Sequence, residues 1–374
     1  MHLDDRRREL AEAMETQGLW PTDSPWVRRA ILDTLPRHQF APDRLWTWNG
    51  RDEYVPVDRG RDQDAWADLV YAGPEDSAII QILDGLPSSS LSCVAVVAVV
   101  ADMLDSLILE PGQRILEVGT GTGWNAGLLA ARAGVGLVTS VEVDTDLATA
   151  AGRRLTAAGL DVAVHAGDGN AGWPAGAPYD GVIATYAVDE IPWTWIEQTR
   201  PGGRLVIPWG RLGHVALTVA DDGRSATGWV QGLGMFMPSR GIDQGREHHA
   251  IRGHGPPDRT VHVDRGLHAL TDVNLLFALR VSHPDIQITT EETAEGLTVR
   301  LHDGVSSWAT AVIDQDGTTA AYEGGPRQLL AEADAGRRHW EERGSPGLWD
   351  FGMTVTPEGQ HVWSGAADAG PYMP

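Results

Sequence analysis

A glycine-rich stretch at residues 114–127 constrains the fold of this chain more than any other feature. An apolar run ends beside Glu117, and glycines follow at the alternating positions Gly119, Gly121 and Gly123. The pattern predicts a buried strand, a tight turn and the first turn of a helix. Glycine permits positive φ and leaves no side chain between the turn and a ligand. The free N–H groups at the helix start would favour an anionic group there.

Two further acidic segments follow at the spacing of a nucleotide-binding sheet. A second strand is expected at 137–143, and its acid, Glu142, is placed to accept hydrogen bonds from both hydroxyls of a ribose. A third strand at 161–165 leads into Gly167-Asp168-Gly169, where the carboxylate can accept a hydrogen bond from an adenine amino group. The three segments together indicate a nucleotide-like ligand.

Two cofactor classes use such a layout. The dinucleotide fingerprint G-x-G-x-x-G/A is matched only loosely, because Ala126 stands where the third glycine would be. The pattern E-x-G-x-G-x-G resembles motif I of S-adenosylmethionine methyltransferases, and Glu117, Gly119, Gly121 and Gly123 match it at every fixed position. A nicotinamide-dependent oxidoreductase and a glycine-rich turn without a ligand remain as alternatives.

The alternation of expected strands and helices predicts an α/β fold with a doubly wound sheet, independently of the glycine motif. In such a sheet the loops after the carboxyl ends of the strands form the site. The last two strands are expected to close the sheet as an antiparallel pair. The expected strands lie at 114–118, 137–143, 161–165, 181–184, 204–208, 214–220 and 227–237, with helices at 124–133 and 145–158.

The region before the sheet is expected to be mainly helical. Helices are predicted at 1–20 and at 24–35, where Ser24 and a following proline form a start signal, and residues 43–87 look irregular. Four serines then precede an apolar helix that runs to about Leu107. One helix cap needs only one hydroxyl, and four serines supply more. A helix cap and a substrate-binding loop are therefore equally supported as the role of these serines. The serines are Ser88, Ser89, Ser90 and Ser92.

Composition limits the partners and the chemistry. The 374 residues suffice for two domains, and a net charge of −23 disfavours nucleic acid and anionic membranes as partners. The chain has no lysine, which excludes Schiff-base chemistry and a Walker A site. Its single cysteine, Cys93, opens an apolar helix and excludes an internal disulfide. The N-terminus lacks the apolar core of a signal peptide, and no apolar run could span a bilayer, so a cytoplasmic location is expected.

The character of the sequence changes near residue 241. Residues 239–268 are rich in arginine and histidine and predict a connector with a locally basic surface. They show no recognisable metal-ligand spacing, so no metal site is expected. Short strands and one helix then predict a separate α+β module. The expected strands lie near 274–281, 285–290, 297–302, 307–314 and 318–322, followed by a helix at 327–342 and a hairpin at 351–363.

Across residues 24–240 the chain resembles the protein-L-isoaspartate O-methyltransferase family. Several separate blocks, in the order of the family, carry the resemblance. They are Pro36-Arg37-His38-x-Phe40-x-Pro42, the glycine loop from Ile115 to Trp124, Gly167-Asp168-Gly169 with Gly172-Trp173-Pro174, Pro201-Gly202-Gly203-Arg204-Leu205-Val206-Ile207-Pro208, and Phe236-Met237-Pro238.

The resemblance implies a Rossmann-like sheet that binds S-adenosyl-L-methionine, releases S-adenosylhomocysteine and acts on a peptide. It places a catalytic domain at 1–240, with a helical part at 1–110 and a cofactor-binding core at 111–240, and an accessory domain for substrate recognition at 241–374. The expected cofactor-binding residues are Glu117, Gly119, Thr120, Gly121, Gly123, Glu142, Val143, Gly167, Asp168, Gly169 and Thr185, and the expected catalytic residues are Ser88, Ser89, Ser90, Ser92 and Tyr186.

Departures from the family's pattern point to a diverged branch. Members that repair damaged proteins carry a Thr-Ile-Ser-x-Pro loop, whereas residues 88–93 here contain four serines, no proline and a shifted register. The residues after 240 have no counterpart in the short repair enzymes. The chain is similar to a branch encoded beside ribosomally made lanthipeptides and graspetides, which methylates an ordinary aspartate whose ester then closes to an aspartimide. Isoaspartate repair and a non-catalytic, peptide-holding partner that binds S-adenosylmethionine are the alternatives.

Overall fold

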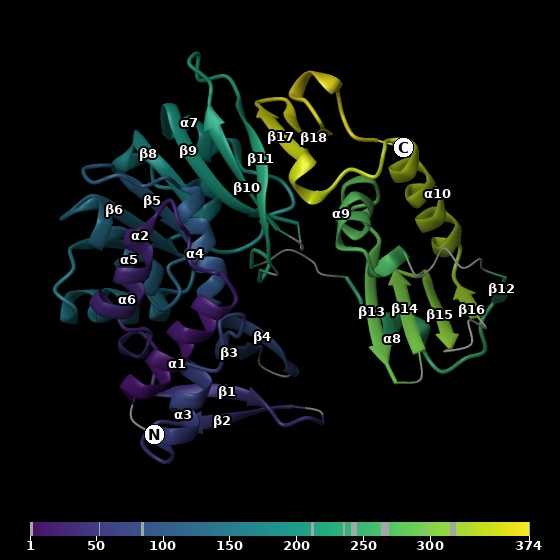
Figure 1. Cartoon of the computed structure of the whole chain (residues 1–374), viewed down its shortest axis with the longest axis horizontal. Coiled ribbons are helices and arrows are strands. Elements are labelled where there is room, and N and C mark those ends of the chain that lie inside the picture. The colour runs from purple at the N-terminus through teal and green to yellow at the C-terminus, as the bar shows by residue number, and fades with distance from the viewer. Residues whose placement is uncertain are drawn as a thin grey trace. The chain divides into compact units, whose positions relative to one another are not determined.

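The computed structural model describes residues 3–51, 53–83, 86–210, 213–234, 236–240, 245–262, 269–294, 296–314 and 319–373. For residues 83 and 86–92 it describes the backbone alone. The chain divides into two compact units (Figure 1). The first comprises Met1–Pro238 with Val355–Gly359, and the second comprises Ser239–Thr354 with Gln360–Pro374.

The first unit is organised around the parallel sheet that the sequence predicts. Strands β9, β8, β5, β6 and β7 pair in parallel in that order, and β10 and β11 follow as the expected antiparallel pair. The apolar run of β5 is buried at every position, as expected for a strand covered on both faces. The strands are β5 (Ile115–Val118), β6 (Val138–Glu142), β7 (Val162–Ala166), β8 (Tyr179–Ala184), β9 (Thr199–Trp209), β10 (Gly213–Val219) and β11 (Ala226–Leu233), and their order in the sheet is β11-β10-β9-β8-β5-β6-β7.

The helices between these strands begin where the sequence predicts. Helix α5 (Trp124–Ala133) follows Gly123, which has a φ of 88°. Helix α6 (Thr145–Ala157) is capped by Asp144, whose carboxylate accepts two backbone N–H groups at 3.0 Å. Because the α5 start and the α6 start both follow a parallel strand, they lie at the same edge of the sheet. Helix α7 (Trp193–Glu197) leads into β9.

Before the sheet, the predicted helices are present, but the prediction of an irregular segment at 43–87 is wrong. This segment holds a helix and three strands of a sheet with the order β2-β1-β3-β4. The strands escaped prediction because few of their side chains are buried: in β1 only Leu45 is, and the edge-on pair of Trp48 and Tyr54, 5.4 Å apart, is partly exposed. The elements are α1 (Leu3–Thr16), α2 (Pro25–Arg29) continued by a π-helix (Ala30–Thr34), β1 (Arg44–Trp48), β2 (Tyr54–Asp58), α3 (Gln63–Val70), β3 (Ala78–Leu83), β4 (Leu86–Val94) and α4 (Val97–Ser106).

The four serines lie in strand β4, so neither a helix cap nor a loop describes their backbone. Helix α4 starts after Val96, which has no side-chain cap. The end of β4 is held by Arg37, a buried side chain that donates hydrogen bonds to the carbonyl oxygens of Val94 at 2.8 Å and Ala95 at 2.7 Å. Burial lowers the pKa of Arg37 to about 10. This arginine therefore ties β4 to the body of the unit.

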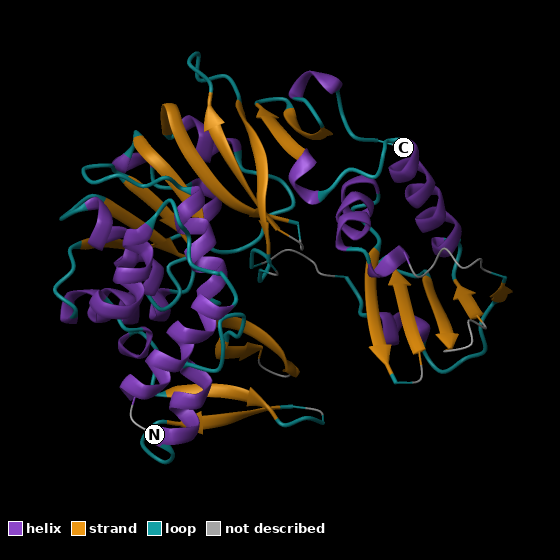
Figure 2. Ribbon diagram, viewed as in Figure 1, coloured by secondary structure: helices purple, strands orange, loops and turns teal. Residues whose placement is uncertain are grey.

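The second unit contains an antiparallel sheet with the order β12-β16-β15-β14-β13 and the helices α9 and α10, which lie side by side (Figure 2). The prediction of a strand at 274–281 is wrong, because these residues form α9. Its cap, Asp272, accepts a hydrogen bond from the backbone N of Asn274 at 2.8 Å. The elements are α8 (His248–Arg252), β12 (Arg259–Val261), α9 (Val273–Ser282), β13 (Gln287–Thr293), β14 (Gly296–His302), β15 (Trp308–Asp314), β16 (Thr319–Gly324), α10 (Leu329–Glu342), β17 (Phe351–Thr356) and β18 (Gly359–Ser364). In the described part of the chain, no helix has the length and apolar character needed to cross a membrane.

Candidate functional site

The glycine loop at the carboxyl end of β5 adopts the backbone that its sequence predicts. Gly119, Gly121 and Gly123 have φ values of 95°, 54° and 88°. A Cβ added at Gly119 would collide with Thr185 Oγ1 and lie 2.9 Å from Tyr186 Cδ1, whereas one at Gly121 would meet no atom within 4 Å. The loop is therefore packed against the protein at Gly119 and open at Gly121.

Two residues after β8 hold this loop from the side. Thr185 Oγ1 donates a hydrogen bond to the carbonyl oxygen of Gly119 at 2.5 Å. The Tyr186 hydroxyl donates to Asn170 Oδ1 at 3.2 Å, and a Cβ at Gly169 would lie 2.5 Å from the tyrosine oxygen. Burial, with the charge of Asp168 adding to it, raises the pKa of Tyr186. Tyr186 thus stays a neutral donor and packs against both glycine segments.

Glu117 lies underneath the loop and does not face the open side. Its side chain is fully buried and accepts hydrogen bonds from Asn125 Nδ2 at 2.8 Å and from Ser140 Oγ at 2.5 Å. The Ser140 hydroxyl is also 2.6 Å from Thr120 Oγ1. Burial raises the pKa of Glu117 to about 7 despite these donors. Sequence reasoning missed Asn125 and Ser140, although a polar residue in the first helical turn and another inside an apolar strand were visible signals.

Glu142 is also buried, but backbone amides hold its carboxylate at the edge of the sheet. Its Oε2 accepts from the Gly121 N–H at 2.8 Å and its Oε1 from the Asp144 N–H at 3.1 Å. Each oxygen keeps a second lone pair that a ligand hydroxyl could use. The next residue, Val143, is 53% exposed and offers an apolar surface beside that carboxylate.

The loop after β7 brings the third predicted acid to the same edge. Gly167 N donates to the carbonyl oxygen of Glu142 at 2.9 Å, which ties the two loops together. Asp168 is exposed, and its Oδ1 accepts from the Asn170 N–H at 2.9 Å. Its second oxygen has no partner among the described residues. The acids after β6 and β7 are therefore both available at one edge.

The serine-bearing strand reaches this edge through its neighbour β3. Gln81 of β3 donates a hydrogen bond to Asp144 Oδ2 at 3.1 Å, two residues beyond Glu142. In the antiparallel register Gln81 lies opposite Ser92, and Ile82 lies opposite Ser90. The backbone of β4 therefore runs close to the loop after β6. The side chains of Ser88, Ser89, Ser90 and Ser92 lie outside the described structure.

The arrangement can hold a nucleoside-like ligand at the edge formed by these three loops. Open backbone at Gly121, two acceptor carboxylates and an exposed aliphatic side chain suit the adenosine part. The hydroxyl groups of Thr185 and Tyr186 lie at the same edge, where they donate to Gly119 O and Asn170 Oδ1. Within the described ranges, no group of three or more His, Cys, Asp or Glu residues comes together to hold a metal ion.

Known proteins with similar sequences agree in their description. The family model named Protein-L-isoaspartate(D-aspartate) O-methyltransferase matches residues 75–231. Protein-L-isoaspartate O-methyltransferase 1 of Archaeoglobus fulgidus is 32% identical over 243 residues, which are 64% of this chain and 96% of that protein. The Pyrococcus horikoshii enzyme of the same name is 33% identical over 209 residues, or 56% of this chain and 79% of that protein. A solved protein-L-isoaspartate O-methyltransferase structure, 19% identical, aligns over 96% of this chain and 100% of its own with a TM-score of 0.49.

Proposed function

This chain belongs to the protein-L-isoaspartate O-methyltransferase family, whose members are S-adenosylmethionine-dependent carboxyl methyltransferases, and from that premise we propose that it esterifies an ordinary aspartate in a constrained, ribosomally made peptide. One observation carries the substrate proposal. The Archaeoglobus fulgidus relative is matched over 96% of its length by 64% of this chain. The rest of this chain lies outside that match, and we propose that it serves substrate recognition.

We assign the cofactor to the edge formed by the loops after β5, β6 and β7. The open backbone at Gly121 would lie along the cofactor, Glu142 would accept from its ribose hydroxyls, and Asp168 from its adenine amino group. Val143 would pack on the adenine ring. When bound, S-adenosyl-L-methionine supplies a methyl group that its sulfonium has already activated. Glu117 is buried beneath the loop and would support its shape without contacting a hydroxyl of the cofactor.

The peptide carboxylate needs no general base. An unperturbed aspartate has a pKa near 4, so at pH 7 it is already the nucleophile. The protein must place it in line with the methyl group and exclude water. In a chain of net charge −23 it must also supply donors that stabilise the carboxylate. We propose that the hydroxyls of β4, at Ser88, Ser89, Ser90 and Ser92, do so together with Tyr186.

The ester is a reactive product. A methyl ester is a better electrophile than a carboxylate, because methoxide is a far better leaving group than oxide. The backbone nitrogen of the next residue can attack the ester carbonyl, the C–O bond to methoxide breaks, the amide proton leaves with methoxide as methanol, and a five-membered aspartimide closes. A macrocycle that holds this nitrogen close would accelerate closure through proximity. We propose that the accessory domain, residues 241–374, recognises the macrocycle or a neighbouring peptide segment.

The test is mass spectrometry of the protein incubated with S-adenosyl-L-methionine and three synthetic peptides of one sequence. One is bridged into a macrocycle around an Asp-Gly pair, one is linear, and one is linear with isoaspartate. We expect a gain of one methyl group on the macrocycle, followed by loss of methanol. Parallel reactions without the protein and without S-adenosyl-L-methionine control for mass changes that the protein does not catalyse.

Isoaspartate repair is the second candidate, because the matched relatives carry that name. Methylation of the isoaspartyl peptide, with none on the macrocycle, would decide for repair and against our proposal.

A variant with alanine at Ser88, Ser89, Ser90 and Ser92 tests whether these serines bind the peptide rather than the cofactor. It should bind S-adenosyl-L-methionine normally in calorimetry and lose at least tenfold in turnover, because only the substrate loses its donors.

A further inference from the structure

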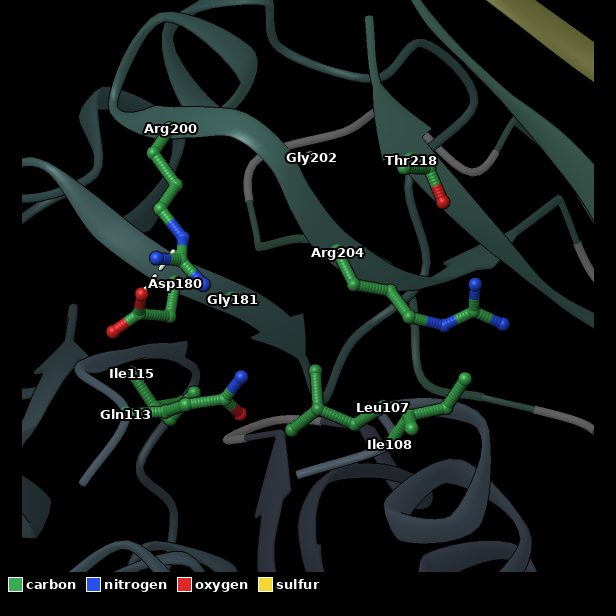
Figure 3. A pocket seen from close by; sticks show the side chains of 10 residues that line it. All are labelled: Leu107, Ile108, Gln113, Ile115, Asp180, Gly181, Arg200, Gly202, Arg204 and Thr218. Carbon is green, nitrogen blue, oxygen red and sulfur yellow. Dashed lines mark ion pairs between the residues drawn. The ribbon is translucent and has the colours of Figure 1, made fainter. Parts of the chain in front are cut away.

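A cavity of ≈ 260 Å³ opens where the parallel strands of the first unit begin (Figure 3). Its wall includes Ile115 at the start of β5, Gly181 near the start of β8, and Arg204 in β9. The amino ends of parallel strands lie at the edge opposite their carboxyl ends, so this cavity is on the far side of the sheet from the glycine loop. None of the residues that we assign to the cofactor or to the peptide lines it.

One ion pair in the wall is already satisfied. Arg200 Nε lies 2.8 Å from Asp180 Oδ1, and Figure 3 shows the two side chains pointing toward each other. Asp180 Oδ2 accepts from the backbone N–H of Arg114 at 2.5 Å. Both oxygens of Asp180 are therefore engaged, and Arg200 is neutralised.

Arg204 is the charge left over. Its Nε donates to the carbonyl oxygen of Ser106, and neither of its terminal nitrogens has a hydrogen-bond or ion-pair partner in the described chain. Figure 3 shows it extending away from the pair of Asp180 and Arg200. The side chain is half-buried, and this burial lowers its pKa with no carboxylate opposing the shift. Two guanidinium groups and one carboxylate leave one uncompensated positive charge in the wall of a strongly acidic protein.

The other side of the cavity is aliphatic. Leu107 and Ile115 are buried in its floor, but Ile108 is 59% exposed at the rim. Its φ of 54° lies in the left-handed region, which a β-branched residue rarely adopts. A strained, exposed isoleucine beside an unpaired arginine presents an apolar and a cationic surface to the same space.

We propose that this cavity is a second, non-catalytic binding site for an aliphatic carboxylate. The terminal nitrogens of Arg204 would pair with both carboxylate oxygens, since guanidinium and carboxylate match as a two-bond pair. Ile108 and Leu107 would cover a branched aliphatic group next to that carboxylate. A peptide that ends in an aliphatic residue, or an aspartate beside one, carries the required chemistry.

Nuclear magnetic resonance of the full chain with ¹³C-labelled isoleucine δ1 methyl groups tests this site. Single Ile→Val variants assign the signals of Ile108 and Ile115. Titration with N-acetyl-L-leucine should shift both signals and saturate, and N-acetyl-L-leucinamide, which lacks the charge, should leave them unmoved. N-acetyl-Leu-Asp-amide carries its carboxylate on the aspartate side chain, whereas N-acetyl-L-leucine carries it at the C-terminus. The ligand that binds more tightly shows which of the two carboxylates the site prefers.

Arg204→Gln should weaken N-acetyl-L-leucine binding at least tenfold, whereas Arg224→Gln, an exposed arginine outside the cavity, should leave it unchanged. Arg204→Lys keeps the charge and loses the two-bond geometry, so its affinity should lie between those of the wild type and Arg204→Gln. It also tests the proposal if the glutamine variant does not fold. Equal shifts with the leucinamide, or full affinity in both Arg204 variants, would overturn the proposal. The measurement involves no methyl transfer, so it is independent of the proposed catalytic function.

Discussion

Two glutamates lie near the carboxyl ends of the neighbouring parallel strands β5 and β6, and the protein uses them differently. Glu117, in β5, is fully buried, bonded to Asn125 and Ser140, and has a pKa raised to about 7. Glu142, at the end of β6, is held by the backbone N–H groups of Gly121 and Asp144. The strand register places Glu117 opposite Ser140, two residues before Glu142. Their difference teaches that Glu117 supports the loop after β5 from below, whereas Glu142 keeps lone pairs at the edge of the sheet that a ligand could use.

The largest expected effect breaks the packed loop. Gly119→Ala should destabilise the protein by about 3 kcal/mol, because a positive φ costs an alanine about 1–2 kcal/mol and overpacking costs about as much again. The new Cβ would collide with Thr185 Oγ1. Gly112→Ala is the matched control, since Gly112 has a φ of 88° and open space around it. Urea unfolding should show only the backbone cost there; equal losses in both variants would mean that the Thr185 contact contributes nothing.

The second prediction uses pH to sharpen the contrast. The pKa of Glu117 rises from 4.5 to about 7 on folding. Between these values the folded protein keeps a proton that the unfolded chain releases, so the stability contribution of Glu117 falls as pH rises and is lowest above pH 7. The wild type should therefore lose unfolding free energy relative to Glu117→Gln as the pH rises from 5 to 8, by about 2 kcal/mol, because glutamine does not titrate.

Urea unfolding of both proteins at the two pH values measures this loss. Glu197→Gln, an exposed glutamate in α7, controls for the loss of one charge. If the difference in unfolding free energy between the wild type and Glu117→Gln does not change with pH, burial does not raise the pKa of Glu117.

The smallest effect concerns the presenting carboxylate. Glu142→Gln keeps an acceptor for Gly121 but loses a charged acceptor for the ribose, so affinity for S-adenosyl-L-methionine should fall about tenfold, or about 1.4 kcal/mol. Calorimetry at pH 7.5 measures it, with Glu197→Gln as the unchanged control. Unaltered affinity in Glu142→Gln would contradict the proposal that Glu142 binds the ribose hydroxyls of the cofactor.

Local patterns were enough to predict the core of the first unit. The glycine loop, the antiparallel pair after β9, and helices α5 and α6 all lie where periodicity and caps placed them. These signals are local, because each depends on residues within one or two turns. The prediction of an irregular segment at 43–87 is wrong for the opposite reason. Strands β1 and β2 are short and partly exposed, and they are held by pairing between strands rather than by a local signal.

The same distinction explains α9. An apolar run at 274–281 fits a buried strand or a buried helix equally well by periodicity. The cap of Asp272 on the Asn274 N–H is the local signal that favours the helix. In the site, the partners of Glu117 were missed because Asn125 and Ser140 reach it from different elements.

The amino-acid sequence by itself determined the strand–turn–helix that opens the sheet, the positions of its three acidic segments and the family resemblance, because these follow from residue type and spacing. Only the tertiary structure decided that Glu117 is bonded to side chains beneath the loop, whereas Glu142 is held by backbone amides at the edge of the sheet. It also decided that the serines lie in a strand beside Gln81, and that Arg204 has no carboxylate partner in the described chain. Burial and hydrogen bonding depend on residues that are distant in the chain, and no local pattern encodes which of them will meet.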